Sequence, residues 1–188
     1  GKTSVILTID EEGRLGVDDM IVLPGGETIV VALDDMRDSS GIQQIRAVRE
    51  HGLRRTRWDP GGRLHSMRAL ASDRFVAAVA RASEADDEEP VPELVVFEAV
   101  TGTQLLTRPI PDASYPPIAV APDGSQLVVG FENRLEVFDA ETLEPQSVID
   151  LEGGTALSLA WSSNDVIAVG SFETVRLFAA ATGAERLD

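Results

Sequence analysis

The sequence predicts an all-β protein built from four copies of one repeat of short strands. The first observation is a repeat of about 40 residues. Phe97, Phe138 and Phe178 are separated by this distance, and similar apolar runs precede each of them. The second is that these runs are short, rich in Val, Ile, Leu and Phe, and separated by turn residues. The third is that no stretch keeps a helical period between caps. A period of this length is typical of a solenoid, a propeller or a repeat array.

Each copy contains short strands that we call a, b, c and d in chain order. The ranges expected for them are 20–23, 28–33, 43–48 and 53–58 in the first copy; 66–70, 75–80, 93–98 and 104–108 in the second; and 117–121, 127–131, 134–139 and 146–150 in the third. In the fourth copy strands a, b and c are expected at 156–161, 166–171 and 174–178, and the chain stops where strand d should begin.

The residue pattern supports these strands individually. Residues 134–139 alternate between two faces, whereas residues 127–130 are almost wholly apolar, as expected of a strand covered on both faces. Residues 66–82 come closest to a helical pattern, but Ser72 and Asp73 fall at the turn position of the repeat. We therefore expect a strand, a turn and a strand there.

One strand-like segment, residues 3–9, belongs to no copy. We expect it to supply the strand d that the fourth copy lacks, so that four blades close into a ring and hide their sheet edges. Residues 1–188 are thus expected to form a single β-propeller domain of four-stranded blades, or a fragment of a propeller.

The repeat resembles that of WD-repeat β-propeller proteins and their bacterial relatives. The residues that carry the likeness are Ala121-Pro-Asp-Gly124 between strands a and b, Val137-Phe-Asp139 at the end of strand c, and Thr101-Gly102 and Thr182-Gly183 just after it. The chain departs from the family where no Gly-His pair precedes strand a and where Phe replaces the Trp of Trp-Asp. The resemblance implies a rigid scaffold that displays a surface for other proteins.

Rings of that family typically have more blades than the four expected here. Four arrangements are therefore open: a small four-blade ring, a fragment of a larger propeller, half of an eight-blade ring made by two copies, or a ring completed by a partner chain. The end of the chain at residues 185–188 favours the fragment slightly over the self-sufficient ring.

Composition narrows the classes of partner and chemistry. The chain has 32 acidic and 16 basic residues and a net charge of −16, which would repel nucleic acid and anionic membranes. It has no cysteine and only two histidines, His51 and His65, which we expect in surface loops, so neither a cofactor nor a metal site is predicted. The first residues lack the layout of a signal peptide, and we expect a cytoplasmic protein.

Acidic residues gather in the loops expected at one end of the blades. In a propeller the b–c and d–a loops emerge on the same face, and more than half of the 32 acidic residues fall in these loops by our assignment. The predicted acidic face contains Asp34, Asp35 and Asp38 from the first copy and Glu84, Asp86, Asp87, Glu88 and Glu89 from the second. Such a face would steer a basic partner, although the same residues also suit a solvated surface.

A second group of candidates combines arginine with aromatic residues. Arg54, Arg55 and Arg57 lie beside Trp58 in the strand d expected for the first copy, with the composition of an interface hot spot or of a charged edge strand. Tyr115 and Trp161 flank strands a and suit either an interaction surface or the core.

The inner strands a decide between two functions. Over residues 20–23, 67–70, 118–121 and 157–160 they carry almost no acid, base or nucleophile, with Arg68 and Ser158 as exceptions, so no catalytic residue is predicted. The first function is a non-enzymatic scaffold or sensor that binds another protein through its acidic loop face. A basic protein would suit this face, and the partner could also be additional propeller blades from the same or another chain. The alternative is a small-ligand or enzyme propeller, similar to quinoprotein or sugar-acting propellers, with a central-channel site partly outside this chain.

Overall fold

The computed structural model describes residues 15–35, 43–49, 56–81, 90–113, 115–163 and 165–186. All regular elements in these ranges are β-strands, which confirms the all-β class. No helix in the described part of the chain is long and apolar enough to cross a membrane.

Within these ranges sixteen strands form four antiparallel sheets of four strands each, and every sheet follows chain order. The first sheet contains β1 (Leu15–Val22), β2 (Thr28–Asp35), β3 (Gln43–Arg49) and β4 (Thr56–Trp58). The second contains β5 (Arg63–Ala69), β6 (Arg74–Ala80), β7 (Pro92–Glu98) and β8 (Gln104–Pro109). The third contains β9 (Ile118–Val120), β10 (Gln126–Gly130), β11 (Arg134–Asp139) and β12 (Pro145–Asp150). The fourth contains β13 (Ser158–Trp161), β14 (Val166–Gly170), β15 (Val175–Ala179) and β16 (Glu185–Arg186).

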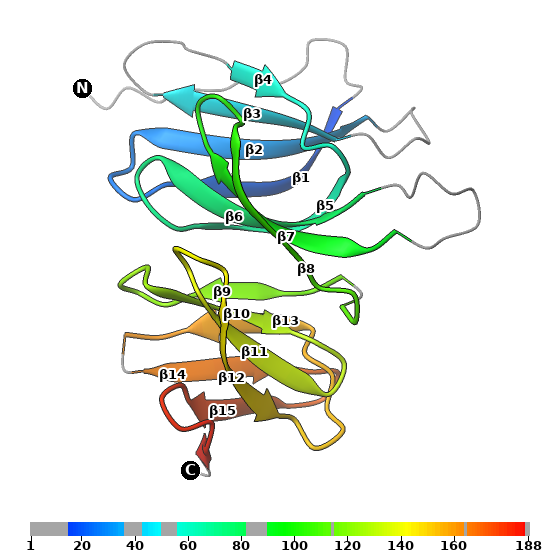
Figure 1. Cartoon of the computed structure of the whole chain (residues 1–188), viewed down its shortest axis with the longest axis vertical. Coiled ribbons are helices and arrows are strands. Elements are labelled where there is room, and N and C mark those ends of the chain that lie inside the picture. Colours follow the sequence, from blue (N-terminus) through cyan, green and yellow to red (C-terminus); the bar gives the residue numbers. More distant parts are fainter. Residues whose placement is uncertain are drawn as a thin grey trace.

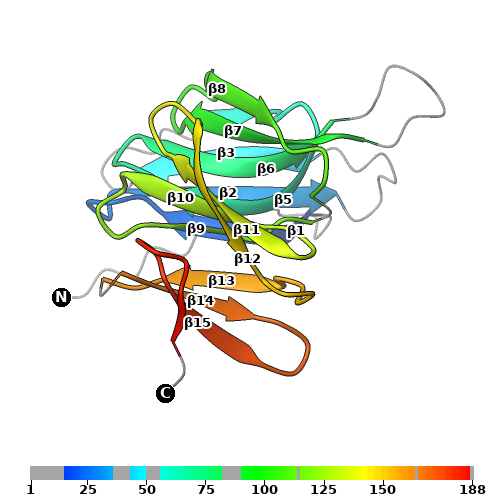
Figure 2. The same cartoon turned by 60° about the horizontal axis from the view of Figure 1, so that its bottom comes forward.

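The four sheets are arranged as the blades of a four-blade β-propeller (Figure 1). Their first strands are the inner ones, since β1 lies beside β5, β5 beside β9, and β9 beside β13. The first sheet lies at one end of the long axis of the molecule and the fourth sheet at the other (Figure 1). Figure 2 also shows the fourth sheet as the outermost of the four. The predicted fold class is therefore confirmed.

The apolar core is divided into three clusters, one at each junction between consecutive sheets. Buried members include Ile45 and Phe75 at the first junction, Leu94 and Phe138 at the second, and Leu135 and Phe178 at the third. Phe97, Phe138 and Phe178, whose spacing defines the repeat, thus pack each sheet against the sheet before it. Within the described ranges, no cluster joins the fourth sheet to the first.

The turns follow the chemistry of the residues that mark the repeat. Gly124 has a φ of 74°, which favours glycine, and its N–H donates to the Ala121 carbonyl at 2.8 Å. The Asp123 carboxylate accepts hydrogen bonds from the Ser125 N–H and hydroxyl. These bonds favour its charged form and hold its pKa below the ordinary value. The turn between strands a and b of the third sheet is therefore built from local hydrogen bonds.

Two features of the strands differ from the expectation. The fourth sheet does have a fourth strand, because Glu185 of β16 pairs with Phe178 of β15. This strand escaped prediction because it has two residues and both are exposed, so it carries no apolar pattern. The segment 3–9, expected to take that place, lies outside the described residues.

The second difference is the length of the inner strands. β1 and β5 begin several residues before the expected 20–23 and 66–70. Both strands contain an irregularity in register, at which one extra residue interrupts the two-residue alternation that marks a strand in sequence.

Candidate functional site

The irregularities of β1 and β5 place two polar residues at equivalent positions. In β1 the register shifts between Val17 and Asp19, so that Asp18 is the extra residue. In β5 it shifts between Leu64 and Ser66, so that His65 is the extra residue. A bulge re-aims a side chain that would otherwise follow the pleat, and bulges are frequent beside functional sites.

The residues next to these bulges link consecutive sheets. One oxygen of the Asp19 carboxylate accepts the N–H of Met67, on the second sheet, at 2.9 Å, and the other accepts the N–H of Met20 at 2.8 Å. Ser66 donates its hydroxyl to the Pro116 carbonyl, ahead of the third sheet, at 3.0 Å. These two polar side chains therefore position the inner strands relative to one another.

A small open pocket of about 170 Å³ lies at this end of the inner strands. The residues that line it are Asp18, Asp19, Ala32, Arg63, Leu64, His65, Ser66 and Tyr115. The ring of His65 meets the ring of Tyr115 edge-on, with centroids 4.5 Å apart. Burial lowers the pKa of His65 and the charge of Arg63 lowers it further, whereas Asp18 acts in the opposite direction. The imidazole is accordingly neutral near pH 7.

The groups in the pocket suit recognition of a cationic side chain. Tyr115 is 69% exposed and offers an aromatic ring, and Asp18 lines the same pocket with a carboxylate. A lysine or arginine can pair with a carboxylate and lie over an aromatic ring at the same time. In the described part of the chain, no three His, Cys, Asp or Glu side chains are grouped to hold a metal ion.

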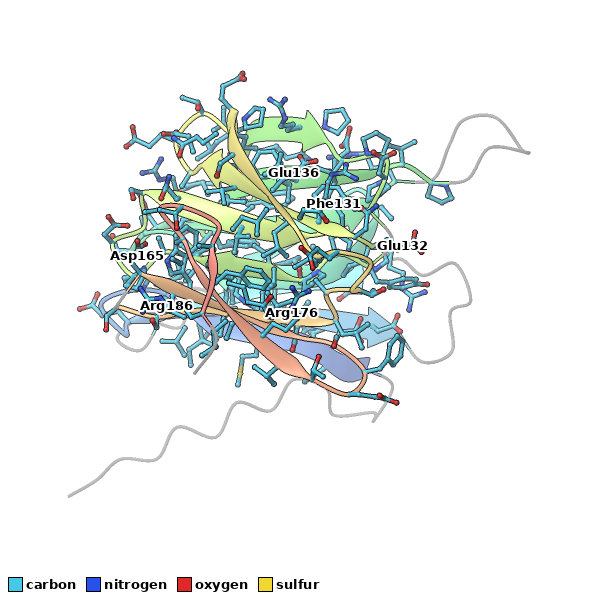
Figure 3. The ribbon with its side chains drawn as sticks, turned by 90° about the horizontal axis from the view of Figure 1, so that it is seen from below. Phe131, Glu132, Glu136, Asp165, Arg176 and Arg186 are labelled. Atoms are coloured by element: carbon cyan, nitrogen blue, oxygen red, sulfur yellow. The ribbon has the colours of Figure 1, made fainter. Side chains whose placement is uncertain are left out.

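A larger cavity of about 290 Å³ lies between the segment that joins the third sheet to the fourth and the residues of β14 and β15, and its charged groups are Glu152 and Arg176. The guanidinium of Arg176 donates to both oxygens of Glu185, at 2.8 and 2.6 Å, and to the Leu151 carbonyl at 2.6 Å. The hydrogen bond to Glu185 raises the pKa of Arg176. In Figure 3 this arginine lies on the fourth sheet, and it is 5.0 Å from the Phe178 ring centroid. These contacts give the arginine a structural role.

The predicted aromatic candidates have different environments. Trp58 is half-buried, and its ring lies 4.9 Å from that of Phe97 and 5.9 Å from that of Phe75, so it belongs to the first apolar cluster. Trp161 packs against the third cluster. Tyr115 alone among these three is strongly exposed and lines the pocket.

The charged candidates are described only in part. Arg57 lies in β4, opposite Arg46 in the register. Asp34 and Asp35 are the last residues of β2 rather than part of the loop that follows. The remaining predicted site residues, Arg54, Arg55, Asp38, Glu84, Asp86, Asp87, Glu88 and Glu89, lie outside the described residues, as does His51.

Sequence reasoning missed Asp18, Asp19, His65 and Ser66 as members of one pocket. The signal that could have found them is the alignment of Met20 with Met67, which puts Asp18 at the position of His65 and Asp19 at that of Ser66. The predicted ranges 20–23 and 66–70 leave out Asp18, Asp19 and His65 and include only Ser66.

Comparison with known proteins assigns no family to the chain and no function to this pocket. No family model matches the chain, and no curated protein matches it.

Proposed function

We propose that this chain is a non-enzymatic propeller scaffold, related to the WD-repeat proteins of bacteria, that binds a basic segment of a partner protein. The binding surface is the end of the blades at which the b–c and d–a loops emerge. The observation that carries the proposal is the pocket at that end, which combines Asp18, a neutral His65 and the exposed ring of Tyr115.

Charge supports the same partner over a longer range. The net charge of −16 attracts a basic segment before contact. Once bound, one cationic side chain would pair with Asp18 and lie against Tyr115. Surface ion pairs are weak, so we expect modest affinity and strong dependence on salt.

A titration with fluorescent peptides tests this function. A lysine- and arginine-rich peptide should bind and should dissociate as salt rises, whereas an acidic peptide of the same length should not bind. Asp18→Asn should weaken binding about twofold to fivefold, the effect of losing an exposed ion pair of about 0.4–1 kcal/mol. Tyr115→Asn should also weaken it, and asparagine tolerates the φ of 52° at that position.

Asp165→Asn is the matched control. Asp165 is exposed and has a φ of 58°, and Figure 3 shows it on the opposite side of the molecule from Glu132, which lies in a b–c loop. This control should leave affinity unchanged. Equal losses for Asp18→Asn and Asp165→Asn would show nonspecific attraction and would refute the pocket as the binding site.

A small-ligand propeller is the second candidate, because the inner strands carry more polar residues than the predicted ranges contained. Asp18, Arg63 and His65 all lie on β1 or β5 and line the pocket. Thermal unfolding with a panel of sugars and cationic small molecules separates the two functions, since a bound ligand raises the melting temperature. A rise with a sugar that Tyr115→Asn abolishes would favour this candidate over the protein scaffold.

A further inference from the structure

Apolar side chains are exposed on both sheets at the ends of the series. On the first sheet, β1 exposes Val17, Met20 and Val22. On the fourth sheet Val175 is 71% exposed and Leu177 is half-buried. Figure 2 shows the fourth sheet at the edge of the molecule, with the third sheet on one side of it.

The outer face of the fourth sheet has the same arrangement of residues as the face with which the third sheet packs against the fourth. The equivalent cross-strand pairs are Gly130 with Leu135 and Val128 with Val137 in the third sheet, and Gly170 with Val175 and Ala168 with Leu177 in the fourth. Leu135 is fully buried in the third apolar cluster, whereas Val175 is exposed. The fourth sheet therefore has the residues of a junction on a face that has no neighbouring sheet among the described residues.

The inner strand of the fourth sheet supports the same conclusion. Asp19 and Ser66 occupy one position of the repeat, opposite Ala32 and Ala78. Asp19 accepts a hydrogen bond from Met67 of the second sheet, and Ser66 donates one to Pro116, in the segment ahead of the third sheet. Ser158 occupies that position in the fourth sheet, opposite Gly170, and is exposed. A polar side chain that links blades elsewhere is thus in place on the last blade.

The first sheet presents the other half of a junction. Met67, opposite Ala77 on β6, is fully buried against the first sheet. Met20 occupies the same position on β1, opposite Val31, and is 58% exposed. Val31 itself is buried, so the free part of this face is the row of apolar side chains on β1.

We infer that the outer face of the fourth sheet binds the β1 row of a second copy of this chain, head to tail. The two surfaces are unlike, since the outer face of the fourth sheet resembles the forward side of a junction that the chain makes three times, and the β1 row occupies the inner-strand position of its backward side. Two copies related by a twofold axis would form two identical junctions and an assembly of eight blades. This inference is independent of the proposed peptide pocket.

Light scattering on a sizing column over a range of concentrations tests the inference. The wild-type chain of 20.1 kDa should give a species of twice that mass, about 40 kDa. Met20→Glu and Val175→Glu each place a charge in both junctions and should each return the mass to 20.1 kDa. Leu105→Glu is the matched control, because Leu105 is an exposed apolar residue on β8 of the second sheet, and it should leave the dimer intact.

Mixing the two variants gives the sharpest result. Met20→Glu keeps an intact fourth-sheet face and Val175→Glu keeps an intact β1 row, so the mixture should regain one junction and a mass near 40 kDa that neither variant shows alone. Circular dichroism establishes that each variant is folded. A wild-type mass of 20.1 kDa at all concentrations, or a dimer that both variants leave intact, would overturn the inference. So would a monomer that pairs only with a different chain supplying further blades.

Discussion

The second and fourth sheets have similar sequences but different surroundings. The central strand β6 of the second sheet is buried from Phe75 to Val79, so both of its faces are covered. The central strand β14 of the fourth sheet is equally apolar, yet only Ile167 and Val169 are buried, and the other three residues of the strand are half-buried. The repeat thus defines two packing faces for every blade, but a face is buried only where a neighbouring sheet is present.

The largest expected effect comes from removing the phenylalanine that occupies the same position of the repeat in both sheets. Phe97 of the second sheet stacks with Phe75 at 5.3 Å and with Trp58 at 4.9 Å between centroids. Phe97→Ala should lower the free energy of unfolding by about 3–5 kcal/mol, measured by urea denaturation. Phe178→Ala, at the equivalent position of the fourth sheet, should cost less because no aromatic ring stacks on Phe178 among the described residues. Equal losses would contradict a contribution from the aromatic stack.

The next effect compares the forward faces of the two sheets directly. Leu94 is fully buried between the second and third sheets, and Val175 is its counterpart on the fourth sheet. Leu94→Ala should cost about 2–5 kcal/mol of unfolding free energy. Val175→Ala should change it by less than about 0.5 kcal/mol in the single chain, measured at low protein concentration. A large cost for Val175→Ala under those conditions would show that the outer face is covered within one chain.

A smaller effect concerns the glycine in the turn that follows the third strand of the second and the fourth sheets. Gly102 and Gly183 have φ values of 74° and 68°, so alanine at either site carries a strain of about 1–2 kcal/mol. A Cβ at Gly102 would also overlap the Trp58 ring, whereas one at Gly183 would lie 3.1 Å from Ile149. Gly102→Ala should therefore lower the melting temperature more than Gly183→Ala. The reverse order would mean that Trp58 moves aside at little cost.

The smallest effect is a dependence on pH that only the second sheet should show. The pKa of His65 is lower in the folded chain than in the unfolded one, so the unfolded state binds more protons as pH falls. Stability should be complete above the unfolded pKa of about 6.5 and should fall as pH drops from there toward the folded pKa. His65→Leu, which copies Leu157 of the fourth sheet, should remove this slope from the melting temperature. An unchanged slope would assign the titration to other groups.

The sequence predicted the third blade more accurately than the first, and missed the last strand of the fourth. Pro122, Asp123 and Gly124 set a turn by local hydrogen bonds, so the strands on either side of it could be placed to within a residue or two. Local signals of this kind do not reveal a bulge, and the polar residues at 18 and 65 were therefore read as parts of loops. Their convergence with Tyr115 depends on how three blades meet, and no single repeat contains that information.

The division of the core into three separate clusters has a mechanical consequence. Among the described residues, each sheet shares apolar clusters only with the sheets next to it in chain order, and no cluster joins all four sheets. The stability of the fold is therefore close to a sum of contributions from pairs of neighbouring sheets. The second and third sheets each have two junctions of this kind, whereas the first and the fourth sheets each have one among the described residues. Local opening should accordingly begin at the end sheets and proceed inward one sheet at a time, so that the first and fourth sheets fray before the second and third sheets separate.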